Sequence, residues 1–150
     1  MHFRKWNLHE QIARGGGVVS AWIVADRLTK KAQARLDRAL DQLLQLPKQD
    51  WHKPNPASAL GNHAYVIRFT DESRKQWRIF GHFHDPHYCF VMTGTGFEKD
   101  DEYEPENYLE LAKSNKTKCD EDFQGYTKPY KNRCNTCPPR TDATSSLRRK

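Results

Sequence analysis

The chain has 150 residues and a net charge of +6, with 36% hydrophobic and 29% charged side chains. Its length fits one domain that buries a core of its own, and its low hydrophobic share predicts flexible ends around a smaller folded centre. No apolar run approaches the roughly 20 residues of a membrane span, and the start at Met1–Trp6 lacks the apolar stretch of a secretory signal. We therefore expect a cytoplasmic protein with reduced thiols and no membrane partner.

Charge is unevenly distributed along the chain. Residues 1–97 carry a net charge of +6, residues 98–122 carry −6, and residues 123–150 carry +6. A basic body, an acidic segment and a basic tail together suit a nucleic-acid or ribosome partner. The alternative is a solvated surface with a disordered tail, and charge alone does not separate the two.

The N-terminal third is expected to hold a loose arm, a strand and a helix. Residues 1–17 end in three glycines, which indicate a flexible joint because no phosphate-binding motif follows them. Residues 18–24 are rich in β-branched side chains and predict a strand. A stripe of apolar residues at steps of three and four then predicts a helix, which Thr29 or Asp26 caps and Pro47 ends. The stripe consists of Leu28, Ala32, Leu36, Leu40, Leu43 and Leu46.

Three further strands are predicted over residues 64–70, 76–83 and 88–93, joined by short polar turns. Short connections make neighbouring strands antiparallel. A helix is expected from about Pro105, since proline suits an early helical position and acids fill the first turn. This order predicts an α+β fold: a small antiparallel sheet of about four strands with helices on one face and flexible termini.

The expected elements divide the chain into three regions. Residues 1–17 form a flexible N-terminal arm, residues 18–118 form the folded domain, and residues 119–150 form a basic, disordered C-terminal tail. The tail is assigned from its composition, because glycine, prolines and a Ser/Thr/Arg/Lys-rich ending offer little to bury.

Short motifs follow one another in a fixed order from residue 51 to residue 112. They are Trp51 with Pro54, Leu60-Gly61, Tyr65-Val66-Ile67-Arg68-Phe69, Trp77-Arg78-Ile79-Phe80-Gly81, Phe97-Glu98-Lys99, Pro105 and Leu111-Ala112. In this order and spacing, roughly residues 18–116 resemble the RelE/ParE superfamily of bacterial toxins, in particular its HigB-like, phage-associated branch. The chain departs from that pattern where a Phe-x-Lys-Lys segment is expected, because acids surround Lys99 here.

The resemblance implies a RelE-like fold and the toxin component of a type II toxin–antitoxin system. The implied activity is that of a ribosome-dependent endoribonuclease, an mRNA interferase that needs no cofactor. The implied partners are the ribosome, mRNA and a cognate antitoxin with a helix-turn-helix fold. The alternative is a non-catalytic binding module on the same fold, such as a gyrase inhibitor or a phage-encoded adaptor, which the acidic residues 100–106 favour.

Metal-free RNA cleavage by 2′-OH attack needs a base, a cation for the phosphate and an acid for the leaving oxygen. Strand alternation places four suitable side chains on one face of residues 76–84. We assign Arg78 to the transition-state charge with Arg68 in support, Lys99 to a phosphate contact or proton relay, His82 or His84 to acid–base catalysis, and Phe80 and Lys53 to RNA binding. The alternatives are a structural ion pair between Arg78 and residues 100–106, and histidines that are only solvated.

Metal binding is the competing use of the histidines and cysteines. His82, His84 and His87 lie close together in the sequence, and Cys134-Asn135-Thr136-Cys137 is a C-x-x-C pair. We expect no metal, with exposed thiols in the tail. The weaker alternative is a zinc site made of Cys119, Cys134, Cys137 and a histidine.

Overall fold

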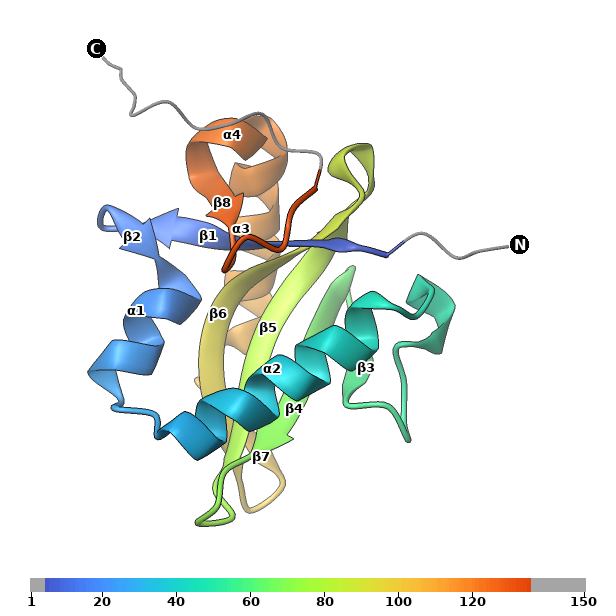
Figure 1. The fold of residues 1–150 in the computed structure, drawn as a ribbon. Coiled ribbons are helices and arrows are strands. Elements are labelled where there is room, and N and C mark those ends of the chain that lie inside the picture. The colour runs from blue at the N-terminus through green and yellow to red at the C-terminus, as the bar shows by residue number, and fades with distance from the viewer. Residues whose placement is uncertain (1–4, 136–150) are drawn as a thin grey trace.

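The computed structural model describes residues 5–135. A mixed sheet forms the middle layer, with two helices against one face and a third against the other (Figure 1). The strands are β1 (Asn7–Ala13), β2 (Gly16–Gly17), β3 (Ala57–Gly61), β4 (Ala64–Thr70), β5 (Gln76–His84), β6 (Cys89–Lys99), β7 (Glu102–Glu104) and β8 (Thr127–Pro129). The helices are α1 (Val18–Ala25), α2 (Lys30–Leu44), α3 (Tyr108–Glu121) and α4 (Phe123–Tyr126), with short 3₁₀ turns η1 (Lys48–Asp50) and η2 (Asp85–His87).

The sheet is larger than the sequence predicts. Its order is β2-β1-β6-β5-β4-β3, while β7 pairs with β6 and β8 pairs with β1, so the described residues form eight strands. Strand β1 runs parallel to β6, whereas the other pairs are antiparallel. The prediction of a small antiparallel sheet of about four strands is therefore wrong. The main reason for the larger sheet is β1. This strand lies inside the sheet, although residues 1–17 were expected to form a flexible arm.

The segment after the three glycines is a helix and not the predicted strand. Arg14 and Gly15 both have positive φ and form a tight turn that pairs β1 with β2. The buried Glu10 carboxylate then accepts hydrogen bonds from the backbone N–H groups of Val19 and Ser20, each at 2.9 Å. These groups begin α1 and have no partner within a helix. A cap from β1 therefore overrides the β preference of the valines.

The main core lies between α2 and one face of the sheet. Thr29 caps α2 by accepting a hydrogen bond from the Ala32 N–H at 3.0 Å, as the sequence predicts. The predicted apolar stripe faces the sheet, which confirms its role in the core. It packs there with Ile67 and Phe69 of β4, Trp77, Ile79 and Phe83 of β5, and Phe90 and Met92 of β6.

The opposite face of the sheet is covered by α3, so the helices do not all lie on one face as predicted (Figure 1). Phe80 of β5 stacks on Tyr108 at the start of α3 with ring centroids 5.3 Å apart. Near the other end of α3, Cys119 is buried against Cys89 and Val91 of β6. The face of β5 that carries the side chains predicted to be catalytic is therefore largely interior.

The first part of the predicted tail belongs to the folded body. Strand β8 pairs with β1, and the Leu8 N–H donates to the Arg133 carbonyl at 2.9 Å. Arg133 also forms ion pairs with Asp37 and Asp41 of α2. Residues 119–135 therefore join the domain, and the remainder of the predicted tail lies outside the described residues. Between residues 5 and 135, no helix combines the length and the apolar character that crossing a bilayer requires.

Candidate functional site

Arg78 lies on the predicted face of β5, where it is 5% exposed. Its guanidinium binds the Glu98 carboxylate on β6 at 2.8 Å and also donates to the Gln76 side chain and the Trp77 carbonyl. Arg78 thus forms a structural ion pair, which was the alternative to a catalytic role. Its partner is Glu98 and not one of residues 100–106. A catalytic role for Arg78 remains a prediction that these contacts do not favour.

The other predicted phosphate contacts are scattered. Arg68 is the cross-strand neighbour of Arg78, but its guanidinium donates to the Ser58 hydroxyl at 2.6 Å and to the carbonyls of Asn55 and Ala57. Burial is the largest cause of a lowered pKa at Arg68, and the charge of Arg78 adds to it. Lys53 is exposed in the turn before β3, and Lys99 is exposed at the end of β6. The structure therefore does not gather these cations into one site.

His82 is buried beneath α3 and is only 1% exposed. Neither ring nitrogen has a hydrogen-bond partner among the described residues. Burial is the main reason why the pKa of His82 is lowered to about 4, and the nearby Asp120 only partly opposes this effect. A neutral, enclosed imidazole cannot exchange protons with a bound RNA, so His82 does not suit the predicted acid–base role.

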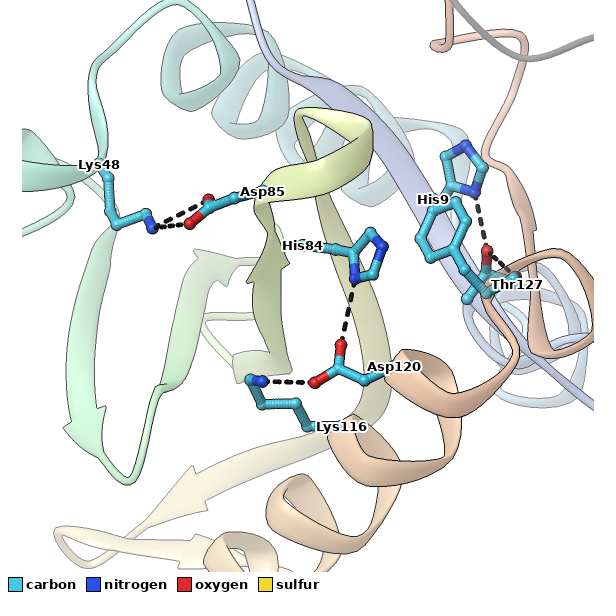
Figure 2. A network of polar contacts seen from close by, with 8 residues as sticks. His9, Lys48, His84, Asp85, Lys116, Asp120 and Thr127 are labelled. Carbon is cyan, nitrogen blue, oxygen red and sulfur yellow. Dashed lines mark hydrogen bonds and ion pairs between the residues drawn. The ribbon is translucent and has the colours of Figure 1, made fainter.

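His84 is the predicted site residue in the most reactive setting. Its Nδ1 lies 3.1 Å from Oδ1 of Asp120, and Oδ2 of Asp120 accepts a hydrogen bond from Lys116 Nζ at 2.6 Å (Figure 2). Burial alone would raise the pKa of Asp120, but the hydrogen bonds from Lys116 and His84 outweigh it and lower the pKa. The carboxylate is therefore ionised and only accepts, so Nδ1 of His84 is the donor. In the tautomer that carries its proton on Nδ1, Nε2 is the hydrogen-bond acceptor.

A cavity of about 300 Å³ adjoins this dyad at the end of the sheet. Phe83 and Asp85, the chain neighbours of His84, line the cavity together with Lys116, the partner of Asp120. Lys48 enters from the other side and pairs with Asp85 at 3.1 Å (Figure 2). The remaining lining residues are His63 and Tyr65. Two ammonium groups and the His63 imidazole thus line a space that is large enough for a phosphate group and lies beside the dyad.

The same end of the sheet gathers further histidines around Phe123 of α4. Its ring stacks on His84 with centroids 4.2 Å apart, and the centroids of His9 and His87 each lie 4.9 Å from it. Cys134 joins this group, with its Sγ 3.3 Å from Nε2 of His87. Cys119 does not join it, because it is buried against β6, where burial raises its pKa to about 11. Cys137 lies outside the described residues.

Sequence reasoning missed His9, Lys116, Asp120 and Phe123. Lys116 and Asp120 are four residues apart on α3, a spacing that is common on any solvated helix. It gives no indication of a histidine 36 residues away. His9 was hidden in a segment expected to be a loose arm. Only the tertiary fold brings β1, η2 and the C-terminal segment together.

A second basic feature lies between α2, residues 54–56 and residues 68–70 at the end of β4. This arginine groove is a hollow of about 330 Å³ whose charged lining consists of Arg35, Arg38 and Arg68. Among residues 5–135, no acidic side chain lines this groove. Arg35 is held in place by donating to the Thr70 and Asp71 carbonyls, each at 3.0 Å.

Comparison with known proteins gives no match for the chain, whether with family models, with curated proteins or with solved structures.

Proposed function

We propose that the protein is a metal-independent endoribonuclease, acting on mRNA as a ribosome-dependent toxin with a cognate antitoxin. The observation that supports this proposal most is the dyad of His84 and Asp120 beside a cavity that Lys48 and Lys116 line. The surplus of basic residues and the sequence resemblance to the RelE/ParE superfamily agree with an RNA substrate. The acid–base role belongs to His84 in this proposal, and Arg78 becomes a structural residue.

Each group of the dyad has a definite task in the reaction. Nε2 of neutral His84 takes the proton of a ribose 2′-OH, and the oxygen then attacks the adjacent phosphorus. The bond to the 5′ oxygen breaks as that oxygen takes a proton from water, which leaves a 2′,3′-cyclic phosphate and a 5′-hydroxyl end. Asp120 fixes the ring and stabilises the imidazolium that forms. Lys48 and Lys116 supply positive charge for the phosphate in the transition state.

Replacement of His84 by Ala tests the proposal. A purified chain would be incubated with a defined mRNA, with and without programmed ribosomes, and the cut positions would be read by primer extension. Loss of a general base typically costs 10²- to 10⁴-fold in rate. We therefore expect His84→Ala to lower the rate of RNA cleavage by about that factor. His52→Ala is the matched control, because His52 is exposed and lies away from the cavity.

Circular dichroism of both variants would establish that the fold is intact. Wild-type activity in folded His84→Ala would contradict the assignment of the base. Absence of cleavage by the wild-type chain, with ribosomes present, would contradict the enzyme itself.

A second candidate function is RNA binding without cleavage, which the arginine groove favours. Its three arginines face a hollow with no acidic side chain in its lining, whereas the lysines near His84 are each paired with a carboxylate. Arginine suits phosphate because its planar guanidinium donates two parallel hydrogen bonds. A non-catalytic module would use this groove as its contact surface.

The salt dependence of binding distinguishes this candidate. Each phosphate contact contributes about one unit to the slope of log K against log salt. We expect Arg38→Ala to reduce that slope by about one, measured by fluorescence anisotropy with a labelled single-stranded RNA. Lys30→Ala removes the same charge from the same helix outside the groove and should leave the slope close to wild type. Equal slopes in the two variants would exclude the groove as the RNA contact.

A further inference from the structure

Three potential metal ligands from distant parts of the sequence converge beside the proposed active centre. They are His9 of β1, His87 of η2 and Cys134, which follows β8, and their ligand atoms all lie within 4.8 Å of one another. His9 is 2% exposed, and the other two are half-buried. Zinc in proteins is bound by imidazole nitrogen and thiolate sulfur, which is the donor set present here.

The spacing of the atoms fits a tetrahedral ion. Zinc–sulfur and zinc–nitrogen bonds of roughly 2.3 and 2.0 Å place the two donor atoms about 3.5 Å apart at a tetrahedral angle. Nε2 of His87 and Sγ of Cys134 are already 3.3 Å apart. Only small side-chain rotations are therefore needed to bring the donors to bonding distance.

The tautomer of His9 is set by a neighbouring hydroxyl. Thr127 Oγ1 donates to the Phe123 carbonyl at 2.8 Å, so it can only accept from His9 Nδ1, which lies 3.0 Å away (Figure 2). The proton of neutral His9 is therefore on Nδ1, and the lone pair is on Nε2. Zinc-bound histidines are held in this way, with the second nitrogen donating to a neighbouring group.

The backbone around the three residues is fixed by further contacts. The Asn7 side chain donates to the His87 carbonyl at 3.2 Å and accepts from the Asn135 N–H at 3.0 Å. One asparagine on β1 thus holds both the η2 turn and the residue after Cys134. The convergence is therefore part of the fold and not an accident of one loop.

We infer that His9, His87 and Cys134 bind a structural zinc ion that fastens the C-terminal segment to β1 and η2. The Cys134 thiol loses its proton to solvent as the ion binds. The site is separate from the dyad of His84 and Asp120, so the inference stands independently of the proposed function.

Cobalt titration of the full-length, reduced chain tests the inference. We expect one equivalent of Co²⁺ to produce thiolate charge-transfer bands in the near ultraviolet and the visible absorption of a tetrahedral site, and Zn²⁺ to displace it. His87→Ala and Cys134→Ser should each weaken binding by more than about 100-fold, since even the loss of an outer-sphere contact costs 10- to 100-fold.

Three further variants make the test specific. Thr127→Val should weaken cobalt binding by about 10- to 100-fold, and Thr127→Ser should restore it, because the hydroxyl fixes the His9 tautomer. His63→Ala and Cys119→Ala are controls outside the cluster and should still bind one equivalent. A wild-type chain that takes up no stoichiometric Co²⁺, or equal affinity in wild type, His87→Ala and Cys134→Ser, would overturn the inference.

Discussion

His82 is the single residue whose burial has the clearest consequence in solution. Its pKa is lowered to about 4 from an ordinary value of 6.5, chiefly by burial. Between these values the unfolded chain binds a proton that the folded chain does not. The free energy of unfolding therefore rises with pH through this window. The contribution of His82 to it is complete above about pH 6.5.

This linkage predicts a pH-dependent difference between wild type and His82→Phe. The shift corresponds to roughly 3 kcal/mol, at about 1.4 kcal/mol for each unit of pKa. We expect the wild-type chain to lose about that much stability relative to His82→Phe as the pH falls from 7 to 4, measured by urea denaturation. Phenylalanine also removes two ring nitrogens that have no hydrogen-bond partner among the described residues.

His52→Phe provides the control for this measurement, because the same substitution at an exposed histidine should leave the wild-type pH dependence unchanged. Parallel curves for wild type and His82→Phe between pH 4 and 7 would show that His82 titrates normally and is not enclosed.

Among the elements, α1 and α2 show when the sequence suffices to predict structure and when it does not. The cap and the apolar stripe of α2 are local features, so the sequence predicts it nearly to its ends. Helix α1 depends on Glu10, which lies on another element. Strand β1 is hidden for a related reason: its buried side chains include Asn7, His9 and Glu10, so it lacks the apolar alternation that identifies strands.

The capping role of Glu10 makes a prediction about stability. Its carboxylate accepts from the Val19 and Ser20 N–H groups and, at 2.6 Å, from the Ser20 hydroxyl. Glu10→Ala leaves these buried donors unsatisfied, which we expect to lower the free energy of unfolding by about 2–3 kcal/mol. Glu110→Ala, on the exposed side of α3, should change it by less than about 0.5 kcal/mol.

Chemical denaturation of the two variants would measure this difference. Equal stability of Glu10→Ala and Glu110→Ala would mean that the carboxylate does not determine where α1 begins. Gly17→Ala offers an independent check, because a Cβ at that position would lie 2.1 Å from Cδ of Glu10 and would displace the cap.

At the scale of the whole molecule, two separate arrangements meet at one end of the sheet. The dyad of His84 and Asp120 lies beside a lysine-lined cavity, while His9, His87 and Cys134 gather near Phe123, whose ring also stacks on His84. The sequence identifies the histidine-rich strand end, since His84 and His87 are local to it. It cannot identify their partners, because Asp120 and His9 reach this end only through the packing of α3 and β1.

The most direct test of the central claim is the end-group chemistry of the RNA that the wild-type chain cuts on programmed ribosomes. Attack by the 2′-OH predicts a 2′,3′-cyclic phosphate on the upstream fragment and a 5′-hydroxyl on the downstream fragment. It also predicts no cut when the ribose at the cleaved position is 2′-deoxy, and strong loss of cutting in His84→Ala beside active His52→Ala. A 3′-hydroxyl with a 5′-phosphate, cleavage of the 2′-deoxy substrate, or no cleavage at all would contradict it.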